Sequence, residues 1–303
     1  MAATTDLSSK TIVITGATSG IGFAALQALA PSGALLIGTG RSEERAAAAR
    51  QSLLEECPTA RVEFALADLA SQSGVRSLAK SIESILFAQR VKQIDVLVNN
   101  AAQIEPWYTA TEDGYEVQFA VNHLAPFLLT HLLLPQLLTA EEGRIITVSS
   151  KSHRHMRIYW QDVMLRKIYN PLLAYKQSKL ANVLFTVELN RRLSGTNVRA
   201  FAVDPGLVNT EIGLKNHSSL VRWVWEKRRQ RGRTPAQGAA TVVQLASCQT
   251  AELLPGDYWR DGKPIPPDRY ALLSVEGQRL WELSERLCGL VPGSLGRLLP
   301  GKI

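Results

Sequence analysis

The sequence predicts an α/β fold in which a parallel β-sheet carries helices on both faces. Short β-branched and apolar runs alternate with longer segments of helical periodicity, the pattern of parallel strands joined by crossover helices. A glycine-rich turn, TGATSGIG at 15–22, connects the first such run to the first helical segment. The 303 residues are 46% hydrophobic and 20% charged, which suits one large soluble domain, 1–303, without internal repeats or linkers.

Six strands are predicted in chain order, each from a short run rich in Val, Ile, Leu or Ala. They are TIVIT (11–15), ALLIGTG (34–40), VEFALAD (62–68), IDVLVNNA (94–101), GRIITVSS (143–150) and VRAFAVDPG (198–206). The helical patterns between them predict helices near 20–30, 42–56, 72–90, 116–138 and 174–193. In the less regular last third, helices near 235–248 and 274–288 belong to a cap, with 250–303 as a C-terminal extension.

Charge and cysteine content exclude several classes of protein. The net charge is +7, and +5 of it lies in RWVWEKRRQRGR at 222–233, so no wide basic patch or recognisable module predicts a nucleic-acid partner. The three cysteines, Cys57, Cys248 and Cys288, are far apart and form no CxxC pair, so we expect neither disulfides nor a zinc site. No run reaches the ~18 apolar residues of a membrane span, and the polar N-terminus is not a signal peptide. A cytoplasmic location is expected.

The glycine turn at 15–22 has the features of a phosphate-binding loop. Glycine lets the backbone turn sharply and approach a ligand closely, and the free N–H groups at the start of the following helix can face a pyrophosphate. The spacing is GxxxGxG, and a lone glycine-rich turn can serve any strand-to-helix connection. Its position after the first strand favours a dinucleotide site.

The end of the second predicted strand indicates which dinucleotide is bound. Proteins that prefer NAD usually place an acidic residue there to bind the ribose 2′-hydroxyl. Here the sequence reads Gly40-Arg41, and a guanidinium is well shaped for a 2′-phosphate. NADP(H) is therefore the predicted cofactor, the alternative being that Arg41 is only a solvated residue at the start of a helix.

Tyr175 and Lys179 lie four residues apart and therefore on one face of a predicted helix. A free tyrosine has a pKa of ~10, and a nearby ammonium favours the phenolate. The pair could then exchange a proton with the oxygen of a carbonyl or an alcohol. Such a pair alone occurs on many helices, where the ring packs and the amine is solvated, so the other motifs must support it.

Those motifs occur in an order that resembles the short-chain dehydrogenase/reductase family. They are 15–22, Asp68, NNAA at 99–102, Asn122, the serine pair 149–150, Tyr175, Lys179, Pro-Gly at 205–206 and Thr210. Ala102 stands where the family usually has glycine. The resemblance covers nearly the whole chain and implies a Rossmann-type, doubly wound parallel sheet in one domain with a C-terminal substrate cap.

The resemblance also implies roles for individual residues. Tyr175 would be the proton donor or acceptor, Lys179 would lower its pKa and hold the nicotinamide ribose, and Ser150 would bind the substrate oxygen together with Tyr175. Asn122 would position a water in a proton relay, and Asp68 would contact the adenine amine, although both could simply make local hydrogen bonds. The implied cofactor-binding residues are Gly16, Thr18, Ser19, Gly20, Ile21, Gly22, Arg41, Asp68, Leu69, Asn99, Ala101, Tyr175, Lys179, Pro205, Val208 and Thr210.

Ser150 and Tyr175 are 25 residues apart, and this long separation resembles the one found in the retinol-dehydrogenase-like branch of the family. That branch implies an NADP(H)-dependent oxidoreductase acting on a bulky apolar carbonyl or alcohol, such as a retinoid, a steroid or a lipid aldehyde. A second, less favoured interpretation is a C=C reductase similar to protochlorophyllide reductase, because Leu207 stands where the proton-donating cysteine of that enzyme is expected. A non-catalytic, NADP(H)-binding regulatory protein remains the alternative from another class.

The segment after Pro-Gly usually covers the substrate in this family, so 207–235 is predicted to be a lid. Its basic, Trp-containing part, 220–233, could instead contact a membrane peripherally or form a solvated surface helix. The family often dimerises through the helices predicted at 116–138 and 174–193, which leaves a homodimer open. His153 and His155 lack a third ligand at a recognisable spacing, and no metal is predicted.

Overall fold

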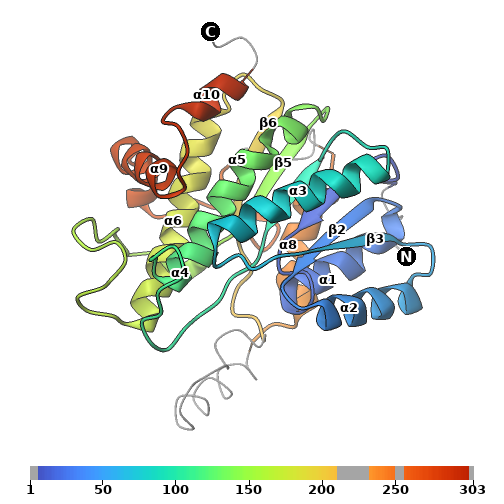
Figure 1. The fold of residues 1–303 in the computed structure, drawn as a ribbon, viewed down its shortest axis with the longest axis horizontal. Coiled ribbons are helices and arrows are strands. Elements are labelled where there is room, and N and C mark those ends of the chain that lie inside the picture. The colour runs from blue at the N-terminus through green and yellow to red at the C-terminus, as the bar shows by residue number, and fades with distance from the viewer. Residues whose placement is uncertain (1–5, 210–231, 250–255, 300–303) are drawn as a thin grey trace.

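The computed structural model describes residues 6–209, 232–249 and 256–299. Thr210 and the membrane contact predicted for 220–233 lie outside the described residues, apart from 232–233, as does most of the lid predicted for 207–235. The described parts form one sheet with helices packed against both of its faces (Figure 1).

The sheet has eight strands in the order β3-β2-β1-β4-β5-β6-β7-β8, parallel except for the last pair. The predicted doubly wound α/β class is therefore confirmed. The strands are β1 (Thr11–Ile14), β2 (Leu35–Gly40), β3 (Arg61–Leu66), β4 (Val96–Asn99), β5 (Gly143–Val148), β6 (Val198–Asp204), β7 (Tyr258–Arg260) and β8 (Lys263–Pro264). The first six were predicted, whereas β7 and β8 were missed because three- and two-residue strands leave almost no periodic signal.

Two hydrophobic layers hold the helices against the sheet, as the alternation of side chains along β1 illustrates. Ile12 and Ile14 belong to one apolar cluster and Val13 to the other, because successive residues of a strand face opposite ways. On the first face lie α1 (Gly20–Leu29), α2 (Glu43–Glu56) and α8 (Pro235–Ser247). On the second lie α3 (Gln72–Ala88), α5 (Ala125–Leu138) and α6 (Pro171–Arg192) (Figure 1).

The helix predicted at 116–138 is interrupted. It consists of α4 (Val117–Phe119), a π turn η2 (Ala120–Leu124) and then α5. The expectation that no segment could span a membrane needs correction, since Val117–Leu138 is long and apolar enough, with a mean hydropathy of 1.4. However, 94% of its most apolar stretch is buried inside the protein, as expected for a core helix of a layered fold.

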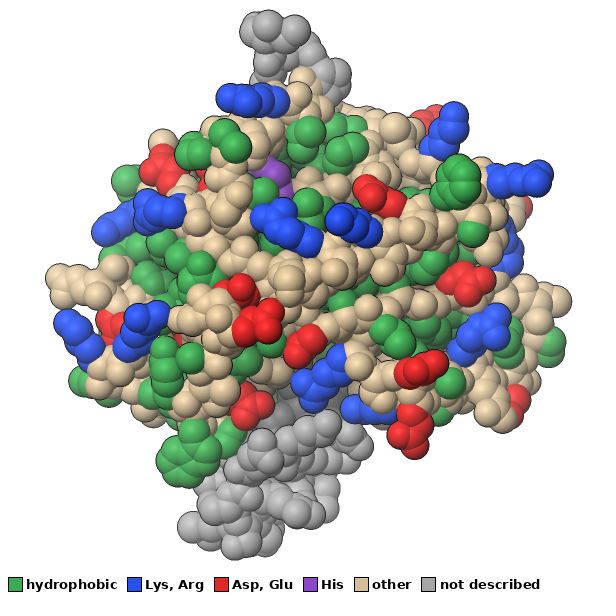
Figure 2. Space-filling view, viewed as in Figure 1, with side chains coloured by type: hydrophobic (Ala, Val, Ile, Leu, Met, Phe, Trp, Pro, Cys, Tyr) green, Lys and Arg blue, Asp and Glu red, His purple; other side chains and the backbone are tan. Residues whose placement is uncertain are grey.

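The C-terminal residues cover helices that the sequence suggested as a dimer interface. In α9 (Ser274–Leu287), the Trp281 ring lies 4.9 Å from the ring of Phe127 in α5 and 6.0 Å from that of Phe185 in α6. The Arg192 guanidinium stacks on the indole, 4.3 Å from its centre. A short helix, α10 (Ser294–Leu298), then packs against α5. On the face shown in Figure 2, acidic and basic side chains are interspersed.

Candidate active site

One cavity of about 790 Å³ opens along the carboxyl ends of the parallel strands. Its lining residues follow β1, β2, β3, β4, β5 and β6 in turn, so six separate loops build a single site. The strand order reverses between β1 and β4, and ligands of open α/β sheets bind at such a switch point. The volume lies within the usual range for a small-molecule or cofactor site.

Glycines are sterically required in the loop between β1 and α1. Gly16 and Gly20 adopt left-handed backbone angles, with φ of 64° and 57°. A Cβ on Gly16 would come within 2.9 Å of the Ala101 Cα, and one on Gly22 would come within 2.4 Å of the Gly16 carbonyl oxygen. The N-cap residue of α1, Ser19, makes no side-chain capping hydrogen bond, which leaves the first helical N–H groups available to an anion.

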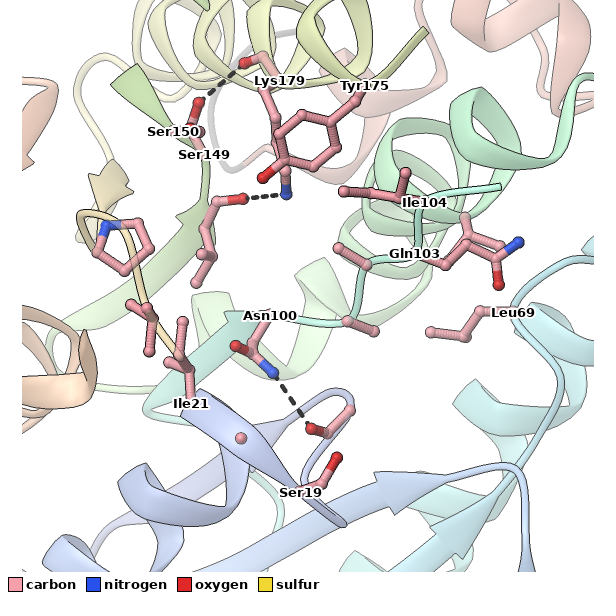
Figure 3. A pocket seen from close by; sticks show the side chains of 18 of the residues that line it. Ser19, Ile21, Leu69, Asn100, Gln103, Ile104, Ser149, Ser150, Tyr175 and Lys179 are labelled. Atoms are coloured by element: carbon pink, nitrogen blue, oxygen red, sulfur yellow. Dashed lines mark hydrogen bonds between the residues drawn. The ribbon is translucent and has the colours of Figure 1, made fainter. Parts of the chain in front are cut away.

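Asn100 fastens this loop to the segment after β4 (Figure 3). Its side-chain amide donates to the carbonyl oxygens of Thr15, at 2.8 Å, and Gly16, at 3.2 Å. Asn100 lines the cavity, whereas the predicted cofactor ligand Asn99 does not: its amide is buried and donates to Thr130. Gly22 is also absent from the lining and acts by allowing close packing.

The end of the cavity beside β2 is basic. Arg41 and Arg45 both line it, together with Ser42, and β2 ends in Gly40 without a carboxylate. Arg45 was not singled out from the sequence; it lies in the first turn of α2, whereas Arg41 precedes the Ser42 N-cap of that helix.

Other predicted cofactor ligands occupy the walls of the same cavity. Thr18, Ser19, Gly20 and Ile21 lie on the glycine loop, Asp68 and Leu69 follow β3, Ala101 follows β4, and Pro205 and Val208 follow β6. The carboxylate of Asp68 accepts a hydrogen bond from the N–H of Ala70, which shapes the turn after β3.

At the opposite end, α6 brings Tyr175 and Lys179 to the cavity beside Ser150 (Figure 3). Helix α6 starts at an Asn170 N-cap followed by proline, three residues earlier than predicted. The buried Lys179 ammonium donates to the Val148 carbonyl oxygen at 2.9 Å and lies 5.6 Å from the centre of the Tyr175 ring. The Ser149 hydroxyl donates to the Lys179 carbonyl at 2.8 Å, so of the two serines Ser150 has the hydroxyl nearer the phenol.

The pKa values at this end differ from the sequence expectation. Burial raises the pKa of Tyr175 to about 12, and the Ser150 hydroxyl opposes this shift. The negative charge of Asp204 raises this pKa further, and Lys179 is not among the groups that shift it, so the expected lowering of the Tyr175 pKa by Lys179 is not seen. Burial also lowers the pKa of Lys179 to about 8.

Asn122 lies in the π turn η2 and joins three parts of the site. Its side-chain oxygen accepts from the Gln103 N–H at 2.8 Å, while its amide donates to the Gln103 carbonyl and to the Ser178 hydroxyl. These bonds tie the loop after β4 to α6. The residue is fully buried and does not line the cavity, so its predicted role in holding a water stays a prediction.

Comparison with known proteins identifies the family. The sequence profile of the short chain dehydrogenases matches residues 10–219. The chain belongs to the short-chain dehydrogenase/reductase family. It is 37% identical to human retinol dehydrogenase 11 over 287 residues, 95% of this chain and 88% of that one. An uncharacterised Mycobacterium paratuberculosis protein superimposes with a TM-score of 0.74 at 35% identity, covering 95% and 97% of the two chains.

The predicted resemblance to the retinol-dehydrogenase-like branch is thus confirmed. The landomycin C-6 ketoreductase LanV with bound NADP has a TM-score of 0.64 at 26% identity, over 84% of this chain and 96% of that one. This dehydrogenase is an oxidoreductase of a family that binds NAD(P)(H). The glycine loop at 15–22, called the glycine cradle below, fits such a dinucleotide, as do the uncapped N-terminus of α1 and the Tyr175–Lys179 pair.

Several cavity residues of this short-chain dehydrogenase were not identified from the sequence. They are Gln103, Ile104, Glu105, Val121, Lys151, Leu172, Lys176, Asp204 and Arg260. Arg260 extends from the unpredicted strand β7 and pairs with Asp204 at 3.6 Å. Among the described residues no group of three His, Cys, Asp or Glu side chains could hold a metal, and His153 is instead buried beneath Ser150.

Proposed function

We propose that this chain is an NADP(H)-dependent oxidoreductase that interconverts a carbonyl and an alcohol on a bulky apolar substrate. The observation that carries the proposal is the single continuous cavity, with the glycine cradle at one end and Tyr175, Lys179 and Ser150 at the other. The glycine loop at 15–22 would hold the phosphates of a dinucleotide, and Tyr175 and Lys179 would lie beside the part of it that carries the hydride.

NADP(H), when bound, supplies or accepts the hydride, and the protein manages the proton. Tyr175 donates its hydroxyl proton to the substrate oxygen during reduction, and the Ser150 hydroxyl orients that oxygen. Lys179 replenishes the proton, since its pKa of about 8 lets it exchange protons near neutral pH. Its ammonium, held at the Val148 carbonyl, is also placed to bond ribose hydroxyls and to favour the phenolate once it forms.

Preference for NADP(H) over NAD(H) is supported by the basic end of the cavity. Arg41 and Arg45 can both reach a 2′-phosphate, and no carboxylate at the end of β2 competes for a ribose hydroxyl. An apolar substrate is supported by the apolar side chains of Ile104, Leu172 and Leu207, which also line the cavity. Retinoids, steroids and lipid aldehydes are substrates of matching size and polarity, and the related human protein is named a retinol dehydrogenase.

The test follows consumption of NADPH and of NADH with a panel of apolar aldehydes and ketones. We expect turnover with NADPH, a higher KM for NADH, and a loss of ~10²–10⁴-fold in kcat for Tyr175→Phe, the range for one general acid. Tyr159→Phe, at an exposed phenol outside the cavity, is the matched control and should retain full activity. Unchanged turnover in Tyr175→Phe would refute the assigned chemistry.

A peripheral membrane contact through 220–233, on an otherwise cytoplasmic protein, is a separate proposal. It rests on the tryptophans and the net charge of +5 in 222–233. Flotation with liposomes of neutral or anionic lipid tests it, and the absence of lipid-dependent binding would exclude it.

A further inference from the structure

A buried histidine beside the reacting serine takes no part in the chemistry proposed above. His153 ends the short 3₁₀ turn η3 (Lys151–His153), three residues after Ser150, and its side chain is completely shielded from solvent. Buried imidazoles need partners for their ring nitrogens, since an unpaired polar group in the interior is destabilising. Both nitrogens of His153 have such partners.

The partners fix the tautomer of the ring. The Nε2 atom is 3.1 Å from the main-chain N–H of Asp268, which can only donate, so Nε2 must accept. The proton therefore resides on Nδ1, which donates to the Ser150 carbonyl oxygen at 2.8 Å. Burial lowers the pKa of His153, which keeps the ring neutral and this pattern intact near neutral pH.

Asp268 also binds the chain just after this turn. The Asp268 carboxylate accepts a hydrogen bond from the main-chain N–H of His155 at 2.9 Å and from that of Tyr270 at 3.0 Å. On the inner side, the His153 ring packs against the ring of Tyr258 in β7, with 4.8 Å between their centres. The imidazole thus lies between two C-terminal segments, and its Nδ1–H bond to the Ser150 carbonyl joins it directly to the active site.

Holding that carbonyl matters because Ser150 starts the turn. Its hydroxyl accepts from the Ser152 N–H at 3.2 Å, and its carbonyl receives the His153 N–H at 3.1 Å in addition to the ring. The orientation of the serine backbone sets where its hydroxyl lies relative to Tyr175. A small displacement of a group that orients a reacting atom can reduce the rate strongly.

We propose that His153 is a positioning residue that fixes Ser150 for catalysis through its Nδ1–H bond to the serine carbonyl. This inference rests on the proposed function, in which Ser150 orients the substrate oxygen. It assigns the C-terminal segment at Asp268 a role in the reaction, transmitted by one imidazole.

Two isosteric substitutions separate positioning from simple structural support. In His153→Asn the amide nitrogen can occupy the Nδ1 position and keep the bond to Ser150, whereas His153→Gln can reach Asp268 but not Ser150. We expect kcat to fall about tenfold in His153→Gln, the loss equivalent to one hydrogen bond of typical strength, and to stay within about threefold of wild type in His153→Asn. The Kd for NADPH should change by less than about twofold in both.

The reverse order of activities, or equal losses in the two variants, would overturn the proposal and indicate that His153 only anchors the C-terminal segment. A second measurement needs no turnover. Nitrogen-15 NMR of histidine-labelled wild-type protein should show one neutral ring protonated on Nδ1, absent from His153→Asn, and a ring protonated on Nε2 would contradict the assigned bonds. If wild type binds NADPH but reduces no carbonyl of the panel, the proposed function and this role fall together, whatever the tautomer.

Discussion

Replacing Gly22 by alanine tests whether close packing of the glycine loop creates the cofactor site. Gly22 lies in α1 and does not face the cavity. An added Cβ would lie 2.4 Å from the Gly16 carbonyl oxygen and 2.6 Å from the Asn100 side-chain nitrogen. Neither atom can retreat freely, because the two are hydrogen-bonded to each other at 3.2 Å and Asn100 is also bonded to Thr15.

The expected cost follows from these contacts. Ordinary carbon–oxygen contacts lie near ~3.3–3.6 Å, so the loop must move by about 1 Å. Such overpacking costs about 1–3 kcal/mol, and weakening the Asn100 bonds adds about 1 kcal/mol. The better helix propensity of alanine returns up to about 1 kcal/mol. The free energy of unfolding should therefore fall by about 1–3 kcal/mol, and the Kd for NADPH should rise at least tenfold as the cradle opens.

Urea unfolding and NADPH fluorescence titration measure the two effects. Gly296→Ala is the matched control, since Gly296 is also helical, in α10, but nothing lies within 4 Å of its added Cβ. It should be neutral or stabilising by less than about 1 kcal/mol and bind NADPH normally. If Gly22→Ala behaved like Gly296→Ala in both assays, the steric account of the cradle would be wrong.

Three further outcomes are expected. Burial lowers the pKa of His123 to about 3 and that of His131 to about 4. The stability that depends on their neutral rings is fully present above the unfolded value of ~6.5 and is lost as the pH falls, toward 4 for His131 and toward 3 for His123. The free energy of unfolding should be lower at pH 5 than at pH 7, by up to ~1.4 kcal/mol for each ring and each pH unit below ~6.5. Equal free energies of unfolding at the two pH values would refute this. Arg41→Ala combined with Arg45→Ala should raise the Kd for NADPH more than tenfold and leave that for NADH within about twofold; equal changes would argue against a 2′-phosphate site. Light scattering should give a monomer of 33.2 kDa, because Trp281 and its helix cover α5 and α6, and a dimer formed through those helices would contradict that packing.

Strong periodic patterns made most of the fold predictable from the sequence. Strands β1, β2, β4, β5 and β6 are apolar runs in which both faces are buried or nearly so, whereas β3 is partly exposed. Among the helices between them, α2, α3 and α6 begin at side-chain caps. The strands β7 and β8 could not be predicted in this way, because their assignment depends on pairing with β6 and with each other. The cavity residue Arg260 was missed for the same reason.

At the site, the sequence identified residue types better than their geometry. The motif containing Asn99 and Asn100 pointed to the cavity, but which side chain faces it depends on the pleat of β4, where neighbours alternate. The spacing of Tyr175 and Lys179 predicted a shared face correctly. It could not predict that burial would move their pKa values in opposite directions, since burial depends on packing by distant segments.

The C-terminal residues that the structure describes, which the sequence placed in the same single domain as a cap, contribute directly to the active site. Arg260 supplies a wall of the cavity, and Asp268 reaches the turn after Ser150 through His153. Further along, the Tyr115 hydroxyl donates to the carbonyl of Leu287 at 2.8 Å, which ties the end of α9 to the loop before α4. Removal of these residues would expose the apolar faces of α5 and α6, which α9 covers, and would release the serine turn, which Asp268 and Tyr258 hold through His153. Stability and catalysis in this dehydrogenase should therefore be lost together on C-terminal truncation.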